Sequence, residues 1–316
     1  MHGQFTWYEL STSDSAAAQR FYPPVTGWSV TNWDQSPASN PYRMWTAPDG
    51  PMAGVMPQSV EQKASGAPSM WLPYIDVDNA QETVRRATSL GGKVIHGPET
   101  MPQVGTFAAL SDPQGAVFAV LQPATRSPGF DGTPKLGHVS WHELLTTDMD
   151  AAWNFYQQLF GWKKGDSMDM GEAGRYQMYG QGGRPFGGMF NRSGRMAHVP
   201  PGWFLYVNVK DVKKARDAAT RGGATVVLDV MEVPGGDQVA MFLDPQGACF
   251  AVHQVAAKSA AAKPSAKKTA RKAAKKSARK ATKKKAARKS VKRPARKAAK
   301  KRVAKRRSAK RGKRKR

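Results

Sequence analysis

Apolar and polar side chains alternate along residues 5–11, a pattern typical of a half-buried β-strand. Asp14 stands where a carboxylate can accept hydrogen bonds from the free backbone N–H groups at the start of a helix. Gly27 stands where helices commonly end, and Ala18 and Phe21 between them can supply a packed face. The pattern therefore predicts a strand followed directly by a helix.

A second strand-and-helix unit follows. Residues 71–77 form an apolar strand, and the helix after them is expected to stop at Gly91 and Gly92. The sequence Asp-Pro-Gln-Gly at residues 112–115 predicts a tight turn between two strands. Further strands are predicted near residues 43–46, 52–56, 93–96, 105–111 and 116–122.

This order of elements is itself repeated. Residues 5–28 match residues 139–162 at an offset of 134 positions, with a shared Trp-x-Glu-Leu start and a shared Gly-Trp end. Residues 111–120 match residues 243–252 at an offset of 132 positions. So many ordered matches indicate a tandem duplication.

Charge divides the chain at residue 258. The 316 residues have a formal net charge of +27, but residues 258–316 hold 31 of the 50 Lys and Arg and no acidic residue. The residues before them hold 19 Lys and Arg against 23 Asp and Glu, a net charge of −4. A mildly acidic body therefore carries a polycation, and the overall charge is not that of a basic folded domain.

Four segments follow from the duplication and the composition. We predict a first domain over residues 1–125, a linker rich in Gly and Pro over 126–136, a second domain over 137–257 and a disordered tail over 258–316. The single cysteine excludes an internal disulfide and a Cys-rich metal site. No secretory signal is visible, and no apolar run approaches the roughly 18 residues that span a bilayer. We expect a cytoplasmic protein that does not bind membranes.

The duplicated motifs resemble the vicinal oxygen chelate superfamily, which includes glyoxalase I, bleomycin-resistance proteins and extradiol dioxygenases. The resemblance rests on the Asp-x-x-x-Ala … Phe-Tyr … Gly-Trp run, the Gly-Gly helix stop and the Asp-Pro-Gln-Gly turn, and it covers residues 5–123 and 139–255. It implies an α+β fold of two tandem glyoxalase-like domains, each made of two βαβββ modules that form a curved mixed sheet. A fold of this kind does not by itself define a reaction.

Metal-using members of that superfamily place His, Gln or Glu on the first and last strands of their modules. The matching positions in this chain hold Trp7, Leu72, Ala119, Trp141, Phe204 and Ala251. These side chains cannot coordinate a divalent cation. We therefore expect no cofactor, although a divalent metal held by Glu143 with His253 stays open as an alternative. His142 is expected to be a partly exposed strand histidine.

The carboxylates of Glu9 and Glu143 are the candidate catalytic groups. Each lies two residues after a tryptophan on an alternating strand, so Trp7 and Trp141 share their faces. A carboxylate against an apolar wall can act as a general base or anchor a ligand, or it can be a structural group bonded to its neighbours. Trp7, Trp141 and Trp203 can stack on a planar ligand or fill the core.

The tail is expected to bind nucleic acid. It resembles the Lys- and Ala-rich C-terminal tails of linker histones and bacterial histone-like proteins, and it has no aromatic residue. Its basic pairs are Lys267 and Lys268, Arg271 and Lys272, Lys275 and Lys276, Arg279 and Lys280, Lys283 and Lys284, Arg288 and Lys289, Lys292 and Arg293, Arg296 and Lys297, and Lys300 and Lys301. Flexible Lys and Arg contact phosphates without reading sequence. DNA or RNA is the expected partner, with polyphosphate, an anionic membrane surface or a solubilising role as alternatives.

Two functions from different classes follow for the body. The first is a metal-independent module that binds a small molecule and is held at the nucleoid by the tail. The second is a metal-dependent lyase or dioxygenase. The body is expected to be either a pseudo-dimeric monomer or a homodimer.

Overall fold

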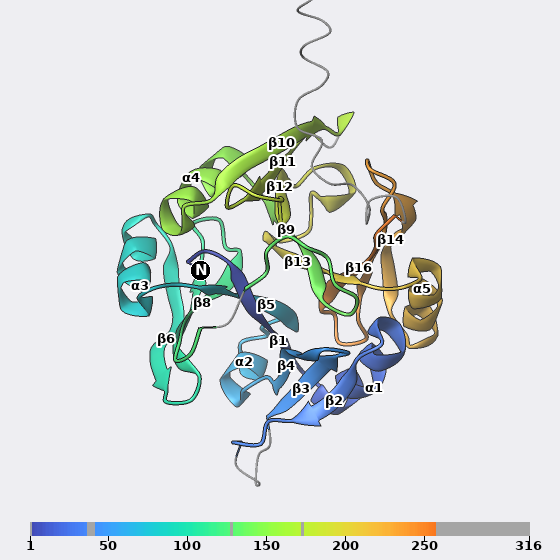
Figure 1. The fold of residues 1–316 in the computed structure, drawn as a ribbon, viewed down its shortest axis with the longest axis horizontal. Helices are drawn as coiled ribbons and strands as arrows, with labels where there is room; N and C mark the ends of the chain where they lie inside the picture. The colour runs from blue at the N-terminus through green and yellow to red at the C-terminus, as the bar shows by residue number, and fades with distance from the viewer. Residues whose placement is uncertain (1, 37–41, 127–128, 172–173, 257–316) are drawn as a thin grey trace, which may run out of the picture. The chain divides into compact units, whose positions relative to one another are not determined.

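The computed structural model describes residues 2–36, 42–126, 129–171 and 174–256. The basic pairs predicted to bind nucleic acid lie outside these residues. The first copy forms one mixed sheet of eight strands in the spatial order β2-β3-β4-β1-β5-β8-β7-β6 (Figure 1). Its strands are β1 (Phe5–Thr12), β2 (Ser29–Asn32), β3 (Arg43–Ala47), β4 (Gly50–Pro57), β5 (Met70–Asp76), β6 (Lys93–Met101), β7 (Gly105–Ser111) and β8 (Val117–Pro123).

The second copy repeats this sheet in the order β10-β11-β12-β9-β13-β16-β15-β14. Its strands are β9 (Val139–Thr146), β10 (Lys163–Asp169), β11 (Arg175–Gly180), β12 (Gly187–Asn191), β13 (Gly202–Asn208), β14 (Thr225–Glu232), β15 (Gln238–Leu243) and β16 (Cys249–Gln254). In both sheets the first strand runs parallel to the fourth and antiparallel to the fifth. The predicted fold of two tandem glyoxalase-like domains is confirmed.

The helices begin and end where the cap residues stand. They are α1 (Ser15–Thr26), α2 (Val60–Ala64), α3 (Ala80–Ser89), α4 (Met149–Phe160), α5 (Val212–Arg221) and the short 3₁₀ helix η2 (Gly194–Met196). Asp14 accepts a hydrogen bond from the backbone N–H of Ala17, and Gly27 ends the same helix in the left-handed region. Asp148 and Gly161 do the same for α4. None of the described helices is long and apolar enough to cross a membrane.

Helices of the first copy pack against helices of the second. Helix α1 of the first copy lies beside α5 of the second, and α3 lies beside α4 (Figure 1). The Tyr22 hydroxyl donates to Asp244 over 2.9 Å, and the equivalent Tyr156 hydroxyl donates to Asp112 over 3.1 Å. Each acceptor belongs to the Asp-Pro-Gln-Gly turn of the other copy. The first module of each copy therefore builds its core with the second module of the other.

The first strands of the two copies meet at the centre of this arrangement. Tyr8 and His142 occupy equivalent positions, and the Tyr8 hydroxyl lies 2.7 Å from His142 Nε2. The ring of Phe5 stacks on His142 with 3.7 Å between centroids. The expectation of a partly exposed His142 is wrong, because the other copy covers this face of the strand and the residue is fully buried.

The tautomer of His142 follows from its two partners. Its Nδ1 lies 2.8 Å from the carbonyl oxygen of Phe186, which can only accept. Nδ1 therefore carries the proton, and Nε2 accepts from Tyr8. Burial lowers the pKa of His142 to about 3 from 6.5, so the ring is neutral.

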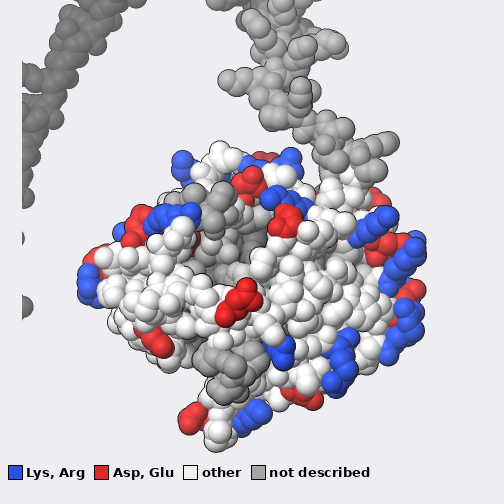
Figure 2. Space-filling view, turned by 60° about the horizontal axis from the view of Figure 1, so that its bottom comes forward, with Lys and Arg blue, Asp and Glu red and all other residues white. Residues whose placement is uncertain are grey.

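The surface of the body is mixed in charge. On the face in Figure 2, acidic and basic side chains stand beside one another around the rim, and uncharged atoms occupy much of the middle. This agrees with the small negative net charge of residues 1–257.

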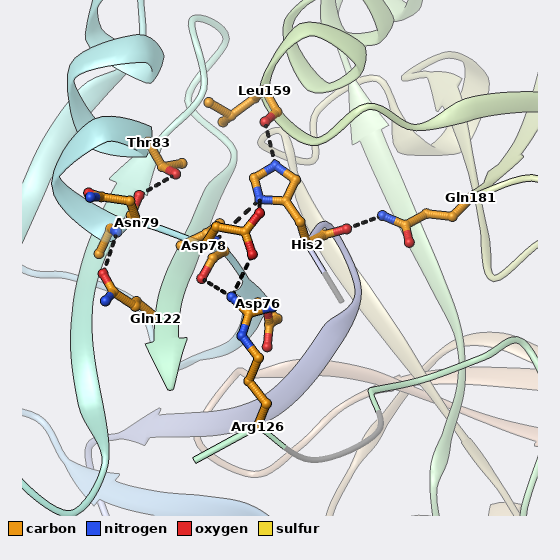
Figure 3. A network of polar contacts seen from close by, with 11 residues as sticks. His2, Asp76, Asp78, Asn79, Thr83, Gln122, Arg126, Leu159 and Gln181 are labelled. Carbon is orange, nitrogen blue, oxygen red and sulfur yellow. Dashed lines mark hydrogen bonds and ion pairs between the residues drawn. The ribbon is translucent and has the colours of Figure 1, made fainter. Parts of the chain in front are cut away.

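A polar network fixes the N-terminal segment (Figure 3). Arg126 forms ion pairs with Asp78 over 2.6 Å and with the buried Asp76 over 3.2 Å. His2 lies between Asp78 and the carbonyl oxygen of Leu159 in the second copy, 3.2 Å from the latter. The contacts join the start of the first sheet to α4.

We predict that His142 makes the folded body sensitive to acid. The unfolded chain takes up a proton at this residue near pH 6.5 and the folded chain only near pH 3. Between these values the unfolded chain binds more protons, so the free energy of unfolding falls by up to about 1.4 kcal/mol per pH unit as pH falls.

Urea unfolding of the wild type and of a Tyr8→Phe/His142→Phe variant over this pH range measures the effect. The variant removes both polar partners and keeps every carboxyl group. The wild type should lose stability relative to it as pH falls. Parallel pH profiles for the two proteins would show that His142 does not control acid sensitivity.

Candidate functional site

Each sheet packs one face on the helices and carries a glutamate on the other. On β1, Phe5 and Leu10 belong to the buried core, whereas Trp7 and Glu9 point to the opposite side and are half-buried. We call the side that carries Glu9 or its equivalent Glu143 the carboxylate face. The prediction that each glutamate shares a face with the preceding tryptophan agrees with this arrangement.

Two tyrosines hold the carboxylate of Glu9. The Tyr42 hydroxyl donates to Oε2 over 2.8 Å, and the Tyr74 hydroxyl donates to Oε1 over 3.4 Å. The indole N–H of Trp7 donates in turn to the Tyr42 hydroxyl over 3.3 Å. The four side chains come from β1, β5 and the residue before β3, so three segments converge on one carboxylate.

The second copy reproduces the arrangement with shorter distances. The hydroxyls of Tyr176 and Tyr206 each donate to Glu143 over 2.9 Å, one to each carboxylate oxygen. The indole N–H of Trp141 donates to the Tyr176 hydroxyl over 2.7 Å. The chain therefore contains two equivalent groups of one Glu, two Tyr and one Trp.

A glycine on the neighbouring strand makes room for the first tyrosine of each group. Gly54 pairs with Glu9 across β4 and β1, and Gly188 pairs with Glu143 across β12 and β9. A Cβ atom on Gly54 would lie 1.7 Å from the Tyr42 hydroxyl. The tyrosine ring thus occupies the space of the missing side chain, which explains why both copies have glycine there.

Burial and hydrogen bonding act on the two carboxyl groups in opposite directions. Burial raises the pKa of Glu9 and of Glu143, and the tyrosine hydroxyls that donate to each carboxylate lower it in part. Each carboxylate oxygen accepts one tyrosine and has capacity for another donor. The arrangement can therefore accept a hydrogen bond from a ligand or take up a proton from it.

Trp203 does not belong to a carboxylate face. Its ring lies 5.3 Å from that of Tyr156 on α4 and 6.1 Å from that of Trp162, within the core on the helix side. The prediction that it lines the ligand site is wrong, because its neighbour Phe204 is the residue of β13 that pairs with Glu143 and shares its face. The alternative of core packing applies to Trp203.

His253 is engaged by partners other than Glu143. Its Nδ1 lies 2.8 Å from the Ser140 hydroxyl, and its Nε2 lies 3.0 Å from an oxygen of Asp237. Burial lowers the pKa of His253, although the hydrogen bond to Asp237 raises it in part. Ser140 and Asp237 therefore engage both ring nitrogens of His253.

The residues of the carboxylate faces do not fit the metal that the resemblance implies. In the described parts of both sheets, each face offers a single carboxylate, Glu9 or Glu143, and the imidazole of His253 has two other partners, so neither carboxylate has a second metal ligand beside it. Within the part of the chain that the structure describes, no three His, Cys, Asp or Glu side chains come together as a metal site. No chemical step through a metal is derived for this chain.

Sequence reasoning missed the tyrosines that hold each glutamate. Tyr42 and Tyr176 are separated by the same 134 positions as the two glutamates, and Tyr74 and Tyr206 are separated by the 132 positions of the later matches. The signal was therefore present in the duplication. It could be found by asking which polar residues recur at both offsets.

Comparisons with known families agree with the duplication. Residues 7–121 match the family model described as a glyoxalase-like domain. Residues 135–252 match the model of the glyoxalase/bleomycin resistance protein/dioxygenase superfamily.

Two curated relatives match most of the body, and a third matches a single domain's length. CFP32 of Mycobacterium tuberculosis, provisionally named a glyoxylase, is 29% identical over 250 residues, which cover 79% of this chain and 94% of that protein. DnrV of Streptomyces peucetius, an anthracycline biosynthesis protein, is 28% identical over 260 residues, with 79% and 92% covered. A glyoxylase-like domain-containing protein of Didymella fabae is 30% identical over 128 residues, with 38% and 94% covered.

Solved structures share the fold at low identity. The Mn(II)-bound glyoxalase from Novosphingobium aromaticivorans superposes with a TM-score of 0.54 at 14% identity, covering 80% of this chain and 82% of that one. The 2,2',3-trihydroxybiphenyl 1,2-dioxygenase from Sphingomonas wittichii gives a TM-score of 0.56 at 11% identity, with 80% and 91% covered. At this identity the likeness concerns the fold alone.

We predict that Gly188→Ala displaces Tyr176 from Glu143. The new Cβ would lie 2.1 Å from the ring carbon that bears the hydroxyl, so the ring has to move and the carboxylate loses a donor. The free energy of unfolding should fall by about 1–3 kcal/mol, the cost of leaving a buried polar group unpaired. Urea unfolding measures the loss.

Gly183→Ala is the matched control, because the Cβ position of Gly183 has open space around it and its backbone needs no positive φ. If the two alanine variants unfold at the same urea concentration, the space at Gly188 is not required for the tyrosine.

Proposed function

Because the chain belongs to the glyoxalase/bleomycin resistance protein/dioxygenase superfamily, we propose that its body binds a small planar molecule on a carboxylate face without a metal. We further propose that the tail holds the protein on nucleic acid. The observation that carries the first proposal is the carboxylate of Glu9 or Glu143, held by two tyrosines beside a tryptophan in a largely apolar wall.

The geometry favours a ligand with both an aromatic ring and a hydrogen-bond donor. The indoles of Trp7 and Trp141 and the tyrosine rings present flat apolar surfaces, on which another ring can stack. The carboxylate beside them keeps acceptor capacity after the two tyrosines have bound, so it accepts a hydrogen bond from a ligand donor and repels a ligand oxygen that has only lone pairs. A phenol has both features.

The name of one relative supports this class of ligand. DnrV is named for the biosynthesis of anthracyclines, which are polycyclic phenols. Only the class of molecule is carried over, because one fold hosts many functions and the identity is 28%.

The alternative function is a metal-dependent lyase or dioxygenase of the same superfamily. It is favoured by the Mn(II)-bound glyoxalase among the structural neighbours. It is opposed by the small number of metal ligands, because among the described residues no three His, Cys, Asp or Glu side chains come together as a metal site. Stoichiometric Zn, Mn or Fe in the purified protein, lost in a Glu143→Gln variant, would establish the alternative.

We predict that naphthol or alizarin raises the thermal stability of the full chain. A ligand present at a hundred times its Kd adds about 2.7 kcal/mol to the free energy of unfolding. A Glu9→Gln/Glu143→Gln variant should show little of this gain, because an amide presents an N–H where the carboxylate accepts from the phenol. A thermal-shift titration measures both.

Glu232→Gln is the control, since Glu232 is exposed at the end of β14 and lies outside the Glu–Tyr–Tyr–Trp groups. An equal gain in stability for all three proteins would mean that the phenols bind elsewhere. No gain in the wild type with either phenol would refute the ligand class.

The proposal for the tail rests on its charge. Residues 258–316 hold 31 basic residues and no acidic residue, whereas the body repels polyanions weakly with its net charge of −4. A chain of this kind binds phosphates by releasing counterions and has no means of reading bases. Its proposed consequence in the cell is association with the nucleoid.

We predict salt-dependent binding to duplex DNA that is independent of sequence. If ten phosphates are neutralised, the slope of log Kd against log salt has a magnitude of about 9. Fluorescence anisotropy with two duplexes of unrelated sequence measures the slope, and the two duplexes should give the same Kd. A chain ending at residue 257 is the control, and undiminished binding by it would place the nucleic-acid site in the body.

A further inference from the structure

The two carboxylate faces differ in what covers them. In the second copy, Leu145, Phe204 and Tyr206 belong to a buried apolar cluster on the carboxylate face. Met196 and Val199, from the connection between β12 and β13, pack against that cluster. The chain itself therefore occupies the face that carries Glu143.

The equivalent connection of the first copy does not pack in this way. It runs between β4 and β5 and contains α2, which has no buried residue. Val60 at its start is 79% exposed. Gln58 donates to the carbonyl oxygens of Ala67 and Pro68 and so closes this connection on itself.

Equivalent residues of the two copies differ in their burial as a result. Glu143, Tyr176, Phe204 and Tyr206 are buried, whereas their counterparts Glu9, Tyr42, Leu72 and Tyr74 are half-buried. Met56 on β4 is 38% exposed, whereas its counterpart Phe190 packs against the apolar cluster. The Tyr74–Glu9 distance of 3.4 Å also exceeds the Tyr206–Glu143 distance of 2.9 Å.

From these differences we infer that the protein has one ligand site per chain, on the carboxylate face of the first copy, and that residues 192–201 fill the second. The inference rests on the proposed function and specifies where the planar phenol binds. In the first copy Glu9 is the acceptor for the phenol hydroxyl, and Trp7 and Leu72 supply apolar contacts. In the second copy Met196 and Val199 take the place of the ligand.

Isothermal titration calorimetry of the full chain with naphthol tests the stoichiometry. We expect one naphthol per chain and the loss of all measurable binding in Glu9→Gln. Two equivalents in the wild type, or one equivalent that survives in Glu9→Gln and disappears in Glu143→Gln, would overturn the inference and leave the proposed function intact. An absence of binding in the wild type would refute the proposed ligand class, and the accessibility of the faces then decides the inference by itself.

Thiol labelling measures that accessibility without a ligand. Leu72 and Phe204 pair with Glu9 and Glu143 respectively, so Leu72→Cys and Phe204→Cys report on the two faces. Both are made with Cys249→Ser, which removes the single native thiol. We expect Ellman's reagent to label the Leu72→Cys variant at least tenfold faster than the Phe204→Cys variant. Equal rates, in proteins that both melt cooperatively, would overturn the inference.

Discussion

Two equivalent positions of a duplicated chain meet at the centre of the molecule, and the hydrogen bond between Tyr8 and His142 lets them do so. Identical residues there would bring like groups together. Instead the Tyr8 hydroxyl donates over 2.7 Å to Nε2 of His142, and the Nδ1–H of the same ring donates to the carbonyl oxygen of Phe186. The first strands can therefore be buried against each other. Glu9 and Glu143 each follow the contacting residue by one position, so this contact fixes where they lie.

Helices of one copy pack against helices of the other and so support the contact between Tyr8 and His142. The Tyr22–Asp244 and Tyr156–Asp112 bonds join each first module to the second module of the other copy. Neither copy encloses its core alone, so the body is one compact unit with two sheets. The carboxylate faces lie away from this shared core and can differ from each other, as Glu9 and Glu143 do, without disturbing it.

Much of this fold follows from the sequence, because alternation and capping are local signals and the duplication repeats them in the second copy. Asp14 and Gly27 bound the first helix as predicted, and alternation placed Trp7 beside Glu9. The short β2 was not predicted, since its mostly exposed residues carry no alternation. The burial of His142 depends on packing against the other copy. The face on which Trp203 lies depends on how β13 pairs with β9, because a shift of one position in that pairing moves a side chain to the opposite face of the sheet. The tyrosines that hold the glutamates come from other strands, which no local pattern reveals.

The glycine beside each glutamate has an evolutionary consequence. Tyr42 precedes Gly54 by twelve positions, and Tyr176 precedes Gly188 by the same interval. Since the ring fills the space that the glycine leaves, a larger residue at the glycine and the tyrosine cannot coexist. The two positions are bound to change together. In this chain the interval of twelve positions, present in both copies, is therefore the sequence signal of a carboxylate that is held in this way.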